Sequence, residues 1–110
     1  MSREEFVPLS EEEREAIKRQ VLEELRKKHF RLTYLQVQIV DQFTDTAVKL
    51  GDKYIAELYG YTGSILGVFG YGAINTIYEM CKRGVFKIQQ FTNPTTKRLK
   101  KYLVFEAPKQ

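Results

Sequence analysis

Apolar residues recur at helical spacing near the start of the chain. Ser10 is followed three residues later by Glu13, which forms a capping box: each side chain satisfies a backbone donor that the first turn of a helix leaves unpaired. This pattern predicts a helix over residues 11–29, and its narrow apolar stripe has to pack on its own domain or on a partner subunit. We expect the stripe to form a dimer contact through Ile17, Val21, Leu22 and Leu25.

A second capping box, Thr33 with Gln36, begins another periodic segment. Its apolar positions run on to Ala47, so we predict a helix that Gly51 ends, because glycine is favoured just beyond a helix C-terminus. Asp52 is then a suitable N-cap, and a short helix is expected over residues 53–59.

Helical periodicity returns after a glycine-rich segment, residues 60–72. Over residues 71–83 one face of the predicted helix is apolar and the other is polar. The face predicted to point outward carries Tyr71, Asn75, Tyr78 and Lys82, and the inward face carries Ala73, Ile74, Ile77, Met80 and Cys81.

The remaining residues have strand and turn chemistry. Residues 85–91 and 97–105 are rich in β-branched and aromatic side chains, and the segment between them is polar and contains Pro94. A β-hairpin is therefore predicted, and the order of helix, helix, short helix, helix and hairpin indicates an α+β fold.

Length and composition narrow the class of protein. A chain of 110 residues has room for one domain, which we divide into an N-terminal helix (1–31), a main domain (32–106) and a short tail (107–110). Cys81 is the only cysteine and His29 the only histidine, so an internal disulfide and a zinc site are both excluded; we expect no metal or cofactor. The first residues lack the features of a signal peptide, and a cytoplasmic location is expected.

Positive charge is concentrated at one end of the chain. The formal net charge is +4, but residues 1–81 carry ten basic and thirteen acidic side chains, whereas residues 82–110 carry eight basic residues and only Glu106 as an acid. A polyanionic partner is therefore expected to bind the C-terminal quarter.

Several segments together resemble a winged helix-turn-helix domain of the kind found in MarR- and ArsR-type prokaryotic regulators. They are the run beginning Leu32-Thr-Tyr-Leu-Gln, the segment Ile55-Ala-Glu-Leu, and the predicted helix ending Lys82-Arg-Gly-Val-Phe, which a turn and a basic strand follow. The resemblance implies a three-helix core with a hairpin wing and an extra N-terminal helix. It also implies a homodimer that binds double-stranded DNA and regulates transcription, with residues 71–83 as the recognition helix and residues 92–97 as the wing tip.

Side-chain chemistry suggests which residues would contact DNA. Asn75 and Thr76 lie in the half of a recognition helix that enters the major groove, and the lysines and arginines suit phosphates. The expected contacts are Tyr71, Asn75, Thr76, Tyr78, Lys82, Arg83, Lys87, Lys97, Arg98, Lys100 and Lys101.

Other interpretations stay open at this point. A basic strand can simply protect a sheet edge, and a winged helix can bind protein instead of DNA. An enzyme is disfavoured because no nucleophile and base pair is evident, and a membrane segment over residues 58–78 is disfavoured because that uncharged run is rich in glycine and polar residues. Cys81 is expected to be a small buried hydrophobe, and His29 to interact with the negative end of a helix. Five aromatic residues could line an effector pocket, although core packing is the commoner role: Tyr54, Tyr59, Tyr61, Phe69 and Tyr71.

Overall fold

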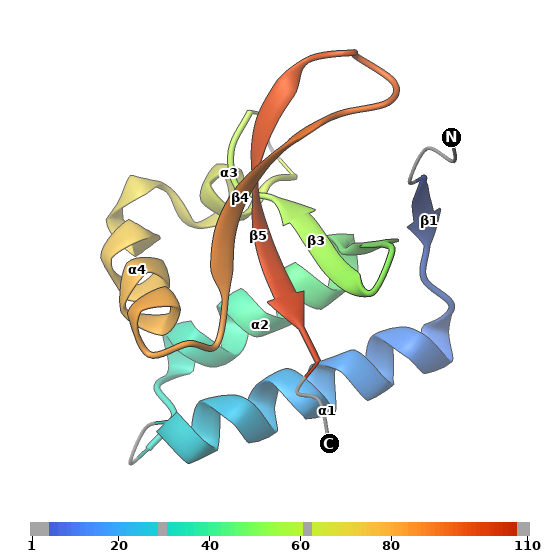
Figure 1. Ribbon diagram of the computed structural model, residues 1–110. Coiled ribbons are helices and arrows are strands. Elements are labelled where there is room, and N and C mark those ends of the chain that lie inside the picture. The colour runs from blue at the N-terminus through green and yellow to red at the C-terminus, as the bar shows by residue number, and fades with distance from the viewer. Residues whose placement is uncertain (1–4, 29–30, 61–62, 108–110) are drawn as a thin grey trace.

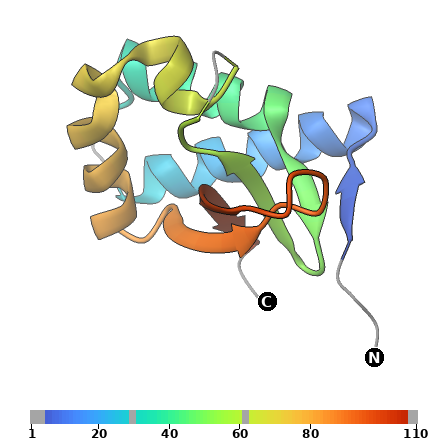
Figure 2. The same cartoon turned by 90° about the horizontal axis from the view of Figure 1, so that it is seen from above.

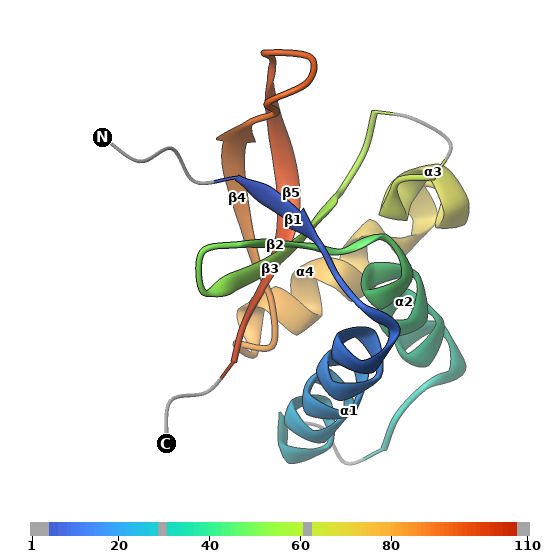
Figure 3. The same ribbon diagram turned by 90° about the vertical axis from the view of Figure 1, so that its right-hand side faces the viewer.

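The computed structural model describes residues 5–28, 31–60 and 63–107, which form the α+β fold that the sequence predicts. The strands are β1 (Phe6–Pro8), β2 (Val48–Leu50), β3 (Lys53–Glu57), β4 (Lys87–Thr92) and β5 (Leu99–Glu106). The helices are α1 (Glu11–Lys28), α2 (Tyr34–Thr46), α3 (Ile65–Phe69) and α4 (Ile74–Lys82), the last preceded by the 3-10 turn η1 (Tyr71–Ala73). All strands of the described residues pair antiparallel in the order β1-β2-β3-β5-β4. The helices gather on one side of this sheet (Figures 1 and 3).

α1 begins where its capping box predicts. The Ser10 hydroxyl accepts a hydrogen bond from the backbone N–H of Glu13, and the Glu13 carboxylate accepts one from the backbone N–H of Ser10, each at 3.2 Å. Arg14 reaches from α1 to the end of α2, where its guanidinium donates to the carbonyl of Asp45 at 2.9 Å. Lys18 forms an ion pair with Asp41 of α2 at 2.6 Å. These contacts attach α1 firmly to α2 of the same chain.

The dimer contact expected on α1 is corrected by this packing. Ile17, Val21 and Leu25 are at most 3% exposed and belong to the main hydrophobic core, and Leu22 packs against that core. Because the stripe is buried within its own chain, a second copy has no access to it. The N-terminal segment is likewise part of the main domain, since β1 pairs with β2.

The predicted end of α2 and the predicted helix over residues 53–59 are both wrong. α2 begins with the expected Thr33 and Gln36 capping box but ends at Thr46, and residues 53–57 form β3. Gly51 and Asp52 are the two-residue loop of a β2–β3 hairpin, with Gly51 at φ 62° in the first loop position, where a type II′ turn favours glycine. Gly51 and Asp52 therefore form a hairpin turn, and not the helix stop and helix cap that the sequence predicts.

The C-terminal hairpin is confirmed, with β4 and β5 as its strands. β5 is central because it pairs with both β3 and β4. On the side of the sheet facing the helices, Leu103 and Phe105 join the main core. The closed end of the hairpin projects beyond the rest of the molecule (Figure 1).

A smaller apolar cluster lies on the other face of the sheet. Ile55, Tyr102 and Val104 are at most 2% exposed there, although the helices lie on the opposite side. Phe6 of β1 reaches Tyr102 of β5 with ring centroids 5.6 Å apart, across two intervening strands. The sheet is therefore curled so that its outer face encloses a core of its own. No helix among the described residues is long and apolar enough to cross a membrane.

Candidate nucleic-acid interface

The caps and turns that precede α4 in the sequence determine where this helix begins. The Ser64 hydroxyl accepts from the backbone N–H of Gly67 at 3.1 Å and begins α3, a helix that the sequence did not predict within the glycine-rich segment. Gly70, at φ 77°, ends α3, and the turn η1 leads directly into α4. The expected helix over 71–83 is thus present, with a 3-10 first turn.

The faces of η1 and α4 match the predicted pattern. Ala73, Ile77 and Met80 are buried in the main core. Tyr71 is 72% exposed and Tyr78 is 53% exposed. We call the outward row the α4 stripe, and its members are Tyr71, Asn75, Tyr78 and Lys82, all of them exposed. Thr76, also expected to contact DNA, is only half-exposed beside the stripe.

α4 ends in a Schellman motif. Gly84, at φ 86°, donates its N–H to the carbonyl of Cys81 at 3.0 Å, and Val85 donates to the carbonyl of Met80 at 3.0 Å. Only glycine adopts this backbone conformation without strain, so the Lys-Arg-Gly sequence fixes both the end of the helix and the start of the hairpin.

Arg83 is committed to contacts within the chain. Its Nε pairs with Glu79 at 3.0 Å, and its Nη1 donates to the backbone carbonyl of Lys28 at 2.9 Å. Arg83 thus neutralises the one acidic residue of α4 and attaches that helix to the end of α1. Its side chain is exposed, and its contact with phosphate stays a prediction.

Two of the hairpin cations expected to contact DNA are also paired within the chain. Lys100 is half-buried and forms an ion pair with Glu57 of β3 at 2.8 Å. Lys87 pairs with Glu106 at 3.3 Å, and Lys53 approaches the same carboxylate at 3.8 Å. Lys97, Arg98 and Lys101 are exposed, and no ion pair within the described residues involves them.

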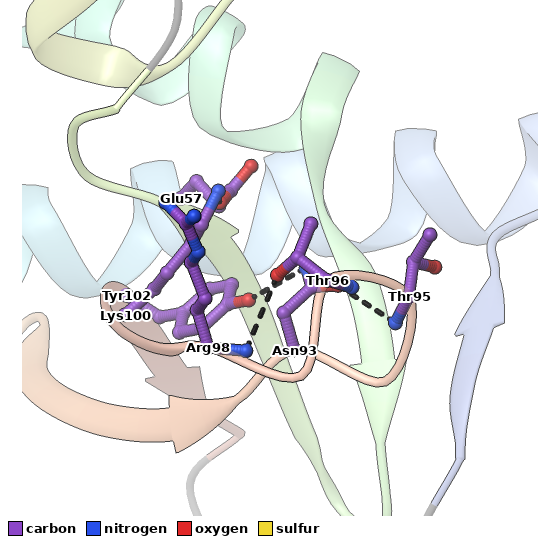
Figure 4. A network of polar contacts seen from close by, with 7 residues as sticks. All are labelled: Glu57, Asn93, Thr95, Thr96, Arg98, Lys100 and Tyr102. Carbon is purple, nitrogen blue, oxygen red and sulfur yellow. Dashed lines mark hydrogen bonds and ion pairs between the residues drawn. The ribbon is translucent and has the colours of Figure 1, made fainter.

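The closed end of the hairpin is organised by one side chain. The Asn93 Oδ1 accepts hydrogen bonds from the backbone N–H groups of Thr95 at 2.9 Å and Thr96 at 3.1 Å, and its Nδ2 donates to the hydroxyl of Tyr102 at 3.1 Å (Figure 4). Lys97 has φ 61° and donates its N–H to the carbonyl of Asn93 at 2.8 Å. We call residues 93–98 the hairpin tip; it presents Lys97 and Arg98 to solvent in a defined loop.

The aromatic residues considered for an effector pocket are divided between core and surface. Tyr54, Tyr59 and Phe69 pack against the main core, whereas Tyr71 is exposed, with its ring 6.4 Å from that of Tyr59. Tyr61 lies outside the described residues. An open groove of about 310 Å³ between α2 and α3 takes only Phe69 from this set; the rest of its lining is Gln38, Asp41, Gln42, Asp45 and Val68.

The remaining candidates for chemistry are few. Cys81 is half-buried, and desolvation raises the pKa of its thiol to about 11, which favours the unreactive protonated form. His29 lies outside the described residues, and within them no group of three or more potential ligands is suitably placed to hold a metal ion.

Comparisons with protein-family models, curated proteins and solved structures found no match to this chain.

Proposed function

We propose that the chain is a winged helix domain that binds double-stranded DNA in a sequence-specific manner and acts as a regulator of transcription. The observation that carries the proposal is the α4 stripe, in which the Asn75 amide and the Lys82 cation alternate with two exposed tyrosines. The opposite face of the same helix is buried in the main core. An α-helix fits the major groove, where asparagine pairs with adenine edges and lysine with guanine or phosphate.

The order of elements supports this proposal. Apart from the additional strand β2 between α2 and β3, the elements α2, β3, α3, α4 and the β4–β5 hairpin follow one another as the helix, strand, two helices and wing of a winged helix do. In this assignment α3 and α4 form the helix-turn-helix, and α3 replaces the residues 53–59 that the sequence suggested. The similarity to MarR- and ArsR-type regulators remains part of the proposal.

The charges also fit this orientation. Lys82 at the end of the stripe and Lys97 and Arg98 at the hairpin tip are exposed, so each is free to contact phosphate. Acidic side chains gather on the early turns of α1, where Glu11, Glu12 and Glu15 line an open groove. Lys82, Lys97 and Arg98 therefore lie on elements other than the early turns of α1, where four of the fourteen acidic residues follow one another closely.

Selection of bound sequences from a random duplex pool tests the proposal directly. We expect the intact chain to enrich a defined sequence, and Asn75→Ala to relax that preference at one position. The double variant Lys97→Ala with Arg98→Ala should weaken binding to all sequences alike and lower the slope of log K against log salt by about 1.8, since each lost phosphate contact accounts for about 0.9.

A matched control removes two positive charges elsewhere. Arg19→Ala with Lys49→Ala changes the net charge equally at positions on α1 and β2, and we expect it to leave the salt slope unchanged. Absence of duplex binding by the intact chain at low salt would contradict the proposal.

Binding of a protein partner is the second candidate. Exposed tyrosines are typical of protein interfaces, and Tyr71 and Tyr78 supply two on one helix face. Enrichment of proteins but not duplexes by the intact chain, abolished by Tyr78→Ala, would favour this candidate.

A further inference from the structure

We propose that the C-terminal end of α1 is a second phosphate-binding surface, which contacts the same duplex beside the C-terminus of α4. We call this surface the α1 end and define it as Lys27, Lys28 and Arg31. The inference rests on the proposed function, and it gives α1 a role in DNA binding in place of the dimer contact that the sequence suggested.

Arg83 connects the two helix ends. Its guanidinium bridges Glu79 on α4 and the backbone carbonyl of Lys28 at the end of α1, at 3.0 and 2.9 Å. The two partners are far apart in the sequence, and Figures 1 and 2 both show the C-terminal ends of α1 and α4 on the same side of the molecule. The α1 end is therefore held close to Lys82, the last member of the α4 stripe.

The charges at this corner are predominantly positive. Lys27, Lys28, Arg31 and Lys82 are all exposed. Among the acids near these cations, Glu24 pairs with Lys27 at 3.5 Å and Glu79 pairs with Arg83, while the exposed Glu23 lies one helical turn before Lys27. Within the described residues no ion pair involves Lys28, Arg31 or Lys82, so three cations are available to an anionic partner.

The C-terminal end of α1 and the hairpin tip lie on opposite sides of the helix α4. In Figures 1 and 3 the tip projects from one extreme of the molecule, and the C-terminal end of α1 lies toward the other, with α4 between them. Contacts to phosphates fix the orientation of a protein on a duplex, whereas contacts to bases specify the sequence. Cations at both ends of a reading helix would therefore set its register in the groove.

Basic residues in a last helical turn also have a structural explanation. They interact favourably with the negative end of the helix dipole, an effect of about 0.3–1 kcal/mol that acts on stability and not on binding. A measurement that separates these two effects is the salt dependence of duplex binding, because only a phosphate contact contributes to it.

The test uses the intact chain and its selected duplex. For Lys28→Ala with Arg31→Ala, we expect affinity on the order of tenfold lower at low salt and a salt slope smaller by about 1.8. The Arg83 bridge is retained, because it uses the backbone carbonyl of Lys28. The charge-matched control, Arg19→Ala with Lys49→Ala, should bind as the unmodified chain does.

The outcomes separate this inference from the proposed function. If Lys97→Ala with Arg98→Ala lowers the slope and Lys28→Ala with Arg31→Ala does not, the α1 end is not a contact and only this inference fails. If the unmodified chain binds no duplex, both fail. If the α1 variant loses thermal stability, the milder pair Lys28→Gln with Arg31→Gln is measured in its place, and an unchanged slope there overturns the inference.

Discussion

α4 and the hairpin tip present polar groups to solvent by different means. α4 is anchored by burial, since Ile77 and Met80 on its inner face are fully buried in the main core. The hairpin tip has no such anchor: Thr95, Thr96 and Lys97 are exposed, and the loop conformation depends on hydrogen bonds to Asn93.

Because of this difference, α4 should contribute to the stability of the whole fold, and Asn93 should determine the local order of the hairpin tip. Removing buried apolar atoms lowers the stability of the whole fold, because the transfer free energy of those atoms is lost and a cavity is left behind. Removing a hydrogen-bonded side chain at an exposed loop costs less, because water replaces much of what is lost. A substitution on the buried face of α4 should therefore lower the free energy of unfolding of the whole chain, whereas a substitution in the hairpin tip should mainly reduce the local order of that loop.

The largest effect is expected at the inner face of α4. Ile77→Ala should lower the free energy of unfolding by about 2–5 kcal/mol, as measured by urea denaturation. Asn75→Ala, on the exposed face of the same helix, is the control and should change it by less than about 0.5 kcal/mol. Equal effects of the two substitutions would show that α4 is not anchored by this face.

A smaller effect is expected at the hairpin tip. Asn93→Ala should lower the free energy of unfolding by about 1 kcal/mol, while hydrogen exchange at the Thr95 and Thr96 amides becomes faster and exchange in α4 is unchanged. If the tip positions Lys97 and Arg98, duplex binding weakens as well.

Asn93→Asp is the matched variant for this prediction. It keeps an oxygen that accepts from Thr95 and Thr96 but loses the amide donor to Tyr102. We expect it to restore slow exchange at those two amides. Fast exchange in Asn93→Asp would assign the order of the tip to the Tyr102 contact instead.

The smallest effect concerns Cys81 on α4. Its pKa is raised from an ordinary 9.0 to about 11 by desolvation, so burial favours the neutral thiol. That contribution to stability is fully present below pH 9 and is lost as the pH rises toward 11. The difference in unfolding free energy between the unmodified chain and Cys81→Ala should therefore be smaller at pH 10 than at pH 8; a difference that grows would contradict the burial of this thiol.

Local signals in the sequence predicted some elements well. The capping boxes at Ser10 and Thr33 mark true helix starts, and the period of 3.6 residues assigns Asn75 and Tyr78 to the exposed face. These succeeded because a cap and a helical period involve only residues a few positions apart.

Features that depend on distant residues were missed. Residues 53–57 fit a short helix by spacing, but pairing with β2 and β5 makes them a central strand. The ion pairs of Lys100 with Glu57 and of Lys87 with Glu106 arise from the register of neighbouring strands. That register is set by the whole sheet, so no local pattern revealed which cations of the hairpin are free.

Tyr102 connects the N-terminal strand to the hairpin tip across the curled sheet. Its ring lies between Phe6 of β1 and Phe91 of β4, and its hydroxyl accepts from Asn93 at the hairpin tip. A force that detaches β1, such as tension applied through a tether at residue 5, would remove one of the two rings that support this tyrosine. The N-terminal strand thus acts as a brace for a loop that lies almost ninety positions further along the chain.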